Sequence, residues 1–334
     1  MMLGRLRAKI LGLLTMVGLI VLLAFSQESK NPPSSSGVRV ISSEPCVLWN
    51  AHCHTLGVTC EGIPERQVQV REFELEKPVG AVLLTTGGAG EFAYSGNVRA
   101  AQTMETLLRA GYEVFEIVWQ AGGGWGTGVR GEGLKRAMCG YAEVVRWISA
   151  NRANKPEVMC AQGNSGGSFQ IAYGLSVYGL EDVFDMVILT GGPPVSRTDV
   201  ACFGTDSPAL KAAVLPEGTR SWAGPFIDRL MGWQNSGDYC AKAAGPEEAL
   251  RQLQATSLVS PIEPRDYSFP KTKVNFVNSE EDGTHANHQG RIYYEKITSP
   301  KSSYQIPGGA HNIDGVEAGT KIIRELFLKE CKEQ

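Results

Sequence analysis

The stretch EVMCAQGNSGGSFQIA, residues 157–172, decides the fold of this chain. An apolar run leads into a glycine-rich centre, and apolar residues return afterwards, which predicts a buried strand, a sharp turn and a helix. The turn has the pattern Gly-x-Ser-x-Gly with Ser165 at its centre. Because the residues two before and two after such a serine face each other, Gly163 and Gly167 leave room for a close approach.

The place of Ser165 in this turn predicts a nucleophile. A serine at the tip of a strand-to-helix turn exposes its hydroxyl group, and the first amides of the helix point to where negative charge develops. The same five residues also fit an ordinary glycine-rich turn. The strand before, the helix after and a suitable acid and histidine downstream favour the catalytic interpretation.

Strands and helices alternate on both sides of this turn. Apolar runs predict buried strands at residues 80–86, 112–119 and 184–190, and further strands are expected at 274–278 and, as a short final strand, at 303–306. Helical patterns occupy residues 100–108, 133–150, 286–297 and 316–330. This alternation predicts a mostly parallel central sheet with helices on both faces. Ligands bind at the carboxyl ends of such strands, where Ser165 and the glycine-rich loops 87–90 and 122–128 are expected.

Two other segments depart from this alternation. Residues 39–77 predict an N-terminal β region, and a change of parity between Val70 and Phe73 predicts a bulge or bend. Residues 193–270 are too long for an ordinary connection, so they predict an insertion with its own helices near 225–233 and 246–254. We expect this insertion to form a cap over the active site, the alternative being a side lobe without substrate contact.

The N-terminal segment predicts export. Arg5, Arg7 and Lys9 precede an apolar run over residues 10–25, so residues 1–26 are a signal peptide or an N-terminal membrane anchor. The Pro/Ser-rich residues 27–38 predict a disordered linker, which leaves residues 39–334 for the main domain. The net charge of −3, without a long basic run, argues against a nucleic-acid partner.

Eight cysteines in an exported chain permit disulfides. We expect at least one bridge within the cluster of Cys46, Cys53 and Cys60, and a second between Cys202 and Cys240 in the insertion. The remaining connectivity cannot be deduced from sequence. Two cysteines are expected as free core thiols, namely Cys139 in a helix and Cys160 in a buried strand.

An activated serine needs a base and an acid that orients the base. Of the five histidines, His311 follows the last predicted strand in a glycine-rich loop, so we expect it to be the base. The acid is expected to be Asp282, in the turn after the preceding strand. The alternatives are His285 and His288 for the base, and Glu280, Glu281 and Asp199 for the acid.

The order Ser165, Asp282, His311, with the serine in a strand–Gly163-Asn164-Ser165-Gly166-Gly167–helix segment, resembles the α/β-hydrolase family. The resemblance covers about residues 68–330 and implies the α/β-hydrolase fold with an inserted lid. It also implies an oxyanion hole formed by the amide of Gly166 and a second amide at Gly88 or Ala89. The loop here, Thr86-Gly87-Gly88, departs from the family by lacking the His-Gly pair that many members carry, so the second donor stays open.

Two other kinds of site have partial signatures in the sequence. The Gly-Asn-Ser-Gly-Gly run and Ala51-His52-Cys53 are similar to signatures of chymotrypsin-like proteases, but no Asp precedes Asp182 and the intervening helices contradict a double β-barrel. The pairs His52-x-His54 and His285-x-x-His288 have the spacing of metal ligands, without an evident third ligand.

The sequence therefore predicts an exported serine hydrolase that cleaves a small-molecule carboxylic ester, with no cofactor and no metal. A peptidase of the same fold and a non-catalytic binding protein on a hydrolase scaffold are the alternatives.

Overall fold

The computed structural model describes residues 37–47, 50–120, 122–127, 129–131, 133–152, 158–204, 224–242 and 244–332. The expected signal peptide or anchor, and residues 27–36 of the expected linker, lie outside these ranges. The last two residues assigned to the linker instead begin strand β1 (Gly37–Pro45), because Val38 pairs with Val58 of strand β2 (His52–Cys60). Within the described ranges, no helix is both long and apolar enough to cross a membrane.

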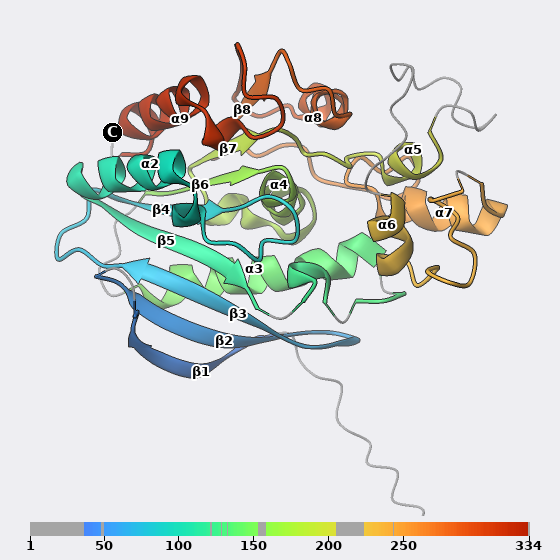
Figure 1. Cartoon of the computed structure of the whole chain (residues 1–334), viewed down its shortest axis with the longest axis horizontal. Helices are drawn as coiled ribbons and strands as arrows, with labels where there is room; N and C mark the ends of the chain where they lie inside the picture. The colour runs from blue at the N-terminus through green and yellow to red at the C-terminus, as the bar shows by residue number, and fades with distance from the viewer. Residues whose placement is uncertain are drawn as a thin grey trace, which may run out of the picture. The chain divides into compact units, whose positions relative to one another are not determined.

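A nine-stranded sheet forms the centre of the described residues 37–332 (Figure 1). Its order is β1-β2-β3-β5-β4-β6-β7-β8-β9. The first three strands and the contact of β3 with β5 are antiparallel, and all contacts from β5 to β9 are parallel. The remaining strands are β3 (Ile63–Phe73), β4 (Gly80–Thr85), β5 (Tyr112–Trp119), β6 (Met159–Asn164), β7 (Met186–Thr190), β8 (Lys273–Ser279) and β9 (Lys301–Ile306).

Helices cover both faces of the sheet and enclose two hydrophobic cores. One core packs under α3 (Gly133–Asn151), α4 (Gly166–Tyr178) and α8 (Ala286–Lys296), and it includes Tyr173 and Tyr293. The other core packs under α2 (Val98–Arg109) and α9 (Glu317–Glu330), and it includes Met104 and Phe327. The prediction of a mostly parallel sheet with helices on both faces is confirmed.

The predicted bulge between Val70 and Phe73 is wrong. Strand β3 pairs with β5 in unbroken register from Val68 opposite Trp119 to Phe73 opposite Val114. Val70 belongs to the core under α3, whereas Phe73 belongs to the core under α2 and α9. Because both faces are covered at this point, a regular strand buries residues of both parities.

The segment between β7 and β8 forms the predicted insertion. Its described part contains α5 (Thr198–Phe203), α6 (Gly224–Leu230) and α7 (Glu247–Thr256), which group together at one side of Figure 1. Residues 205–223 lie outside the described ranges. A disulfide between Cys202, in α5, and Cys240 connects two parts of the insertion, as predicted.

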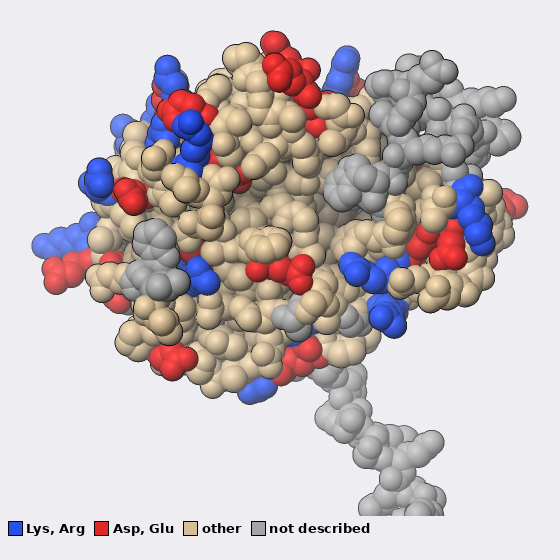
Figure 2. All heavy atoms as spheres, in the orientation of Figure 1, with Lys and Arg blue, Asp and Glu red and all other residues tan. Residues whose placement is uncertain are grey.

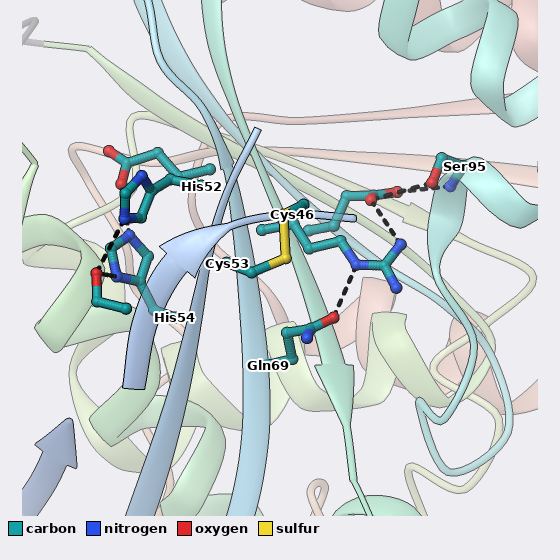
Figure 3. Close-up of a disulfide and its surroundings, with 10 residues drawn as sticks. Cys46, His52, Cys53, His54, Gln69 and Ser95 are labelled. Atoms are coloured by element: carbon teal, nitrogen blue, oxygen red, sulfur yellow. Dashed lines mark hydrogen bonds and ion pairs between the residues drawn. A yellow bond between two sulfur atoms is a disulfide. The ribbon is translucent and has the colours of Figure 1, made fainter. Parts of the chain in front are cut away.

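Four disulfides join the eight cysteines. The bridge between Cys46 and Cys53 confirms the prediction for the N-terminal cluster, and Figure 3 shows it beside β2. The prediction of two free thiols is wrong, because Cys139 is bonded to Cys60 and Cys160 to Cys331. Both errors concern partners far apart in sequence, by 79 and 171 residues, which only the folded chain brings together. Four disulfides fit an oxidising environment outside the cytoplasm.

Candidate active site

Ser165 occupies a strained turn between β6 and α4. Its backbone has φ 51° and ψ −111°, a conformation that residues with a side chain rarely adopt. A Cβ atom on Gly163 would lie 2.4 Å from the carbonyl carbon of Gly167, and one on Gly167 would lie 2.7 Å from Oγ1 of Thr85. The two glycines therefore face each other across the turn, as expected from the sequence, and they allow the sharp reversal.

The structure brings Ser165, His311 and Asp282 together. The ring of His311 has its Nε2 atom 2.7 Å from Oγ of Ser165 and its Nδ1 atom 3.0 Å from Oδ2 of Asp282. Asp282 follows β8 and His311 follows β9, so the carboxyl ends of neighbouring parallel strands position both residues. Since an ionised carboxylate only accepts hydrogen bonds, Nδ1 carries the proton and Nε2 accepts from the serine hydroxyl.

The environment of Asp282 favours its ionised form. Burial opposes ionisation, but hydrogen bonds from His311 and Thr284 outweigh it and lower the pKa of Asp282. One of these bonds comes from the backbone N–H of Thr284 to Oδ1, at 2.9 Å. Asp282 therefore carries a negative charge that holds the His311 ring in one orientation.

The residues predicted as alternative acids or bases differ from Asp282 and His311 in their partners or in their exposure to solvent. Asp199 is buried in α5, where Arg197 forms an ion pair with it at 2.6 Å. Glu280 and Glu281 are exposed beside Asp282. His285 caps α8, and burial, followed by the charge of His311, lowers the pKa of His285.

The two segments that the sequence predicts to bind the oxyanion, the start of α4 and the loop with Gly88 and Ala89, meet at Ser165. Gly166 begins α4, so its amide lies in the first turn, where amides have no carbonyl partner within the helix. The carbonyl oxygen of Gly88 would lie 2.0 Å from a Cβ atom on Gly166, and Ser165 Cβ would lie 3.2 Å from one on Gly87. The loop that carries Gly88 and Ala89 therefore packs directly against the start of α4.

Trp125, in η2 (Gly124–Gly126), holds this loop in place. Its indole Nε1–H donates to the carbonyl of Gly88 at 3.1 Å, and its backbone N–H donates to the carbonyl of Ala89 at 3.0 Å. The two carbonyl groups are thus directed toward Trp125. Which of the two loop amides completes the oxyanion hole stays a prediction.

A second set of hydrogen bonds fixes Ser95, which follows the loop that carries Gly88 and Ala89. The carboxylate of Glu116, buried in β5, accepts from the backbone N–H of Ser95 at 2.5 Å and from its hydroxyl at 3.1 Å. Arg71 lies 3.7 Å from the same carboxylate and donates to Gln69 at 2.9 Å. Figure 3 shows this chain of polar groups running from Gln69 to Ser95. Burial raises the pKa of Glu116, while the bonds from Ser95 and Arg71 oppose the rise.

The sequence pattern did not indicate Asn164 and Gln162 of β6, whose side chains contact the segment that carries His311. Asn164 donates from its side chain to the carbonyl of His311 at 3.4 Å, and its Oδ1 accepts from Thr190 at 3.0 Å. Gln162 contacts Asp314, three residues after His311. Alternation along β6 is the only sequence signal for these polar groups, and it is weak because the strand is buried on both faces.

A cavity of about 280 Å³ opens beside the start of α4 and the loop that carries Gly88 and Ala89. Gly88, Ala89 and Gly166 contribute to its wall, and so do Phe226 and Ile227 of α6. Helix α6, which lies in the predicted insertion, therefore lines part of this cavity, and whether the insertion acts as a cap stays a prediction.

One of the two histidine pairs with the spacing of metal ligands lies in the N-terminal β region. His52 and His54 lie on β2, where both rings hydrogen-bond to the hydroxyl of Ser43 at 3.1 Å and 3.0 Å (Figure 3). His54 also contacts Glu72 at 2.9 Å. Cys53, between the two histidines, is bonded to Cys46. Among residues 37–332 as described, no three His, Cys, Asp or Glu side chains are grouped so that they could hold a metal ion.

Comparisons with known proteins identify the architecture. No family model matches the chain, and no curated protein matches its sequence. Among solved structures, acetyl xylan esterase 1 from Thermoanaerobacterium sp. JW/SL YS485 has a TM-score of 0.56 at 11% identity, covering 89% of this chain and 88% of that chain. EstE1, a carboxylesterase cloned from a metagenomic library, has a TM-score of 0.51 at 16% identity, covering 94% of each chain. Esterase 2 from Thermogutta terrifontis has a TM-score of 0.50 at 13% identity, covering 90% of this chain and 97% of that chain.

Together with the sheet order and the strand–turn–helix at Ser165, these likenesses establish that the chain has the α/β-hydrolase fold. The prediction of the fold is confirmed.

Proposed function

We propose that this protein is an exported serine hydrolase that cleaves carboxylic esters through Ser165, His311 and Asp282. The observation that carries the proposal is the position of the His311 ring, 2.7 Å from the Ser165 hydroxyl and 3.0 Å from the Asp282 carboxylate. This is the arrangement that activates a serine, because the base lies within hydrogen-bond reach and a third group orients it.

In the first half of the reaction, the oxygen of Ser165 attacks the carbonyl carbon of the ester while Nε2 of His311 takes the hydroxyl proton. The charged imidazole is stabilised by Asp282. Negative charge on the carbonyl oxygen is bound by the amide of Gly166 and by an amide at Gly88 or Ala89. His311 then returns its proton to the departing alkoxide, and an acyl group remains on Ser165.

In the second half, a water molecule attacks the acyl group while His311 takes one of its protons. The carboxylic acid leaves, and the proton on His311 returns to Ser165. The reaction consumes one ester and one water, and it yields one acid and one alcohol. Apart from the ester and the water, these steps use only side chains and amides of the chain.

Ester substrates and export have separate support. Three structural neighbours with a TM-score of at least 0.50 are esterases by name, and the cavity beside Ser165 has room for a small acyl group. Four disulfides and the basic, then apolar, N-terminal segment are typical of exported proteins.

A kinetic comparison tests the proposal and its alternatives. Wild-type protein and Ser165→Ala are assayed on 4-nitrophenyl esters of two to eight carbons and on matched 4-nitroanilide peptides. We expect turnover of the esters that falls at least a thousandfold in Ser165→Ala, because the acyl-enzyme cannot form. Faster turnover of peptides would favour the peptidase, and equal rates for wild type and variant would contradict the mechanism.

A further inference from the structure

The cavity beside Ser165 lies where the acyl half of an ester would sit. Gly166 and the Gly88–Ala89 loop form one side of it, and these are the residues proposed to bind the carbonyl oxygen. A carbonyl group held there directs its acyl chain into this space. The volume of about 280 Å³ is below the range of about 300–1,000 Å³ for drug-sized ligands, so it suits a short acyl chain.

The walls of this cavity are largely apolar. Trp125 and Phe226 pack edge to face with ring centroids 5.2 Å apart, and Phe169 of α4 and Leu134 of α3 also line the cavity. Such walls favour methylene or aromatic carbons over hydroxylated chains, because burying a hydroxyl group without a partner costs free energy.

One cation contributes to this apolar lining. Arg229, in α6, is half-buried, and its guanidinium lies over the Phe226 ring at 4.9 Å from the centroid. Across the described residues, no Asp or Glu side chain forms an ion pair with Arg229, although most other arginines there have one. Arg229 thus contributes to the lining a positive charge that no described Asp or Glu neutralises.

The carboxylate of Glu91 also lines the cavity, but unlike the Arg229 guanidinium it forms a hydrogen bond with the backbone. Glu91 is exposed, and its carboxylate accepts a hydrogen bond from the backbone N–H of Gly123 at 2.8 Å. Water and this bond solvate the charge of Glu91. The half-buried guanidinium is less screened, so Arg229 is the stronger of the two charges toward a bound molecule.

We infer that the preferred substrates are esters of short dicarboxylic acids, in which the free carboxylate at the far end of the acyl chain binds Arg229. This inference rests on the proposed ester hydrolysis. The apolar walls hold the methylene groups, and the guanidinium fork matches the carboxylate. Arg229 is thus a specificity-determining residue, separate from the residues that carry out the chemistry.

The test uses three 4-nitrophenyl esters with six-carbon acyl chains that differ only in terminal charge: the hexanoate, the monoester of adipic acid and the 6-aminohexanoate. Each is assayed with wild-type protein, Arg229→Met, Arg229→Lys and Glu91→Gln. Arg251→Met is the control, because Arg251 is an exposed arginine of α7 that is paired with Glu248.

For wild-type protein we expect kcat/KM to fall from the adipate ester to the hexanoate and then to the aminohexanoate. In Arg229→Met the ratio of adipate to hexanoate should fall about 20-fold, in line with the loss of a charge-assisted hydrogen bond. Arg229→Lys should retain part of the preference and Arg251→Met should retain it fully. Glu91→Gln should retain or strengthen it, because this variant removes a negative charge from the lining.

Two results would overturn the inference while leaving ester hydrolysis intact. One is a wild-type preference for the hexanoate or the aminohexanoate. The other is an adipate preference that survives in Arg229→Met. If wild-type protein hydrolysed none of the three esters, the proposed function itself would fail, and the inference with it.

Discussion

The indole N–H of Trp125 donates to the carbonyl oxygen of Gly88, which lies in the loop proposed to bind the oxyanion, at 3.1 Å. A second bond, from the Trp125 backbone to Ala89, fixes the next peptide group. Loops that bind a developing charge contribute most when their amides need no reorganisation during the reaction. Trp125 therefore orients the loop that we propose binds the oxyanion, and it also lines the cavity that we propose takes the acyl chain.

Trp125→Phe should lower kcat about tenfold with a smaller change in KM, because the ring remains but the donor to Gly88 is lost. The measurement is steady-state kinetics on the best ester, with unfolding followed by circular dichroism. Trp147→Phe, in α3 and outside the acyl cavity, is the control. An unchanged kcat in a folded Trp125→Phe variant would contradict a role in orienting the loop.

Gly163→Ala should destabilise the protein by about 3 kcal/mol or more, because the added methyl group would overlap the backbone of Gly167. Chemical denaturation measures this free energy of unfolding. The matched control is Gly96→Ala, since nothing lies within 4 Å of a Cβ atom there. If the two variants were equally stable, the close approach at the serine turn would not be a constraint on the sequence.

The sequence predicts most of the fold because its strands and helices have strong local patterns. The strand at residues 112–119 coincides with β5, and the helix predicted at 133–150 differs from α3 by a single residue. The bulge in β3 was predicted wrongly because the parity of Phe73 reflects which helices cover each face, and that information is not local. The partners of Cys139 and Cys160 were missed for the same reason.

The candidate site is predicted less completely than the fold. Ser165 has a local signature, and the order of Asp282 and His311 along the chain narrows the choice of partners. The roles of Trp125 and Asn164 depend on hydrogen bonds to backbone carbonyls, and any loop residue with a donor could make such bonds. Sequence pattern therefore indicates the reacting groups better than it indicates the groups that orient them.

Removing the disulfide between Cys160 and Cys331 should destabilise the protein more than removing the one between Cys46 and Cys53. The first closes a loop of 171 residues and the second a loop of 7. Loop-closure entropy then predicts a difference of about 3 kcal/mol in the free energy of unfolding. Paired Cys→Ala variants measured by denaturant titration test this, and equal losses would show that loop length does not govern these bridges.

Asp314→Asn should stabilise the protein at alkaline pH relative to wild type. Burial raises the pKa of Asp314 from its ordinary 3.8 to about 6. The protonated form is favoured in the folded state, so this contribution to stability is fully present below pH 3.8 and is lost as the pH rises through 6. Asparagine does not ionise, and the variant should therefore gain about 3 kcal/mol relative to wild type between pH 4 and pH 8.

Thermal or urea denaturation at four pH values measures the effect of Asp314→Asn. The control is Asp182→Asn, since Asp182 is exposed and pairs with Lys271 at the surface. A difference between Asp314→Asn and wild type that stays constant with pH would contradict a buried carboxyl group that stays protonated up to about pH 6 in the folded protein.

Covalent labelling with a fluorophosphonate probe, followed by peptide mapping, tests the central claim most directly. The probe reacts with serines that an adjacent base activates. The expected result is a single adduct on Ser165 in the wild-type protein and none in a folded His311→Ala variant. An adduct on another residue, or a folded wild-type protein that remains unlabelled, would contradict the assignment of Ser165 and His311 as nucleophile and base.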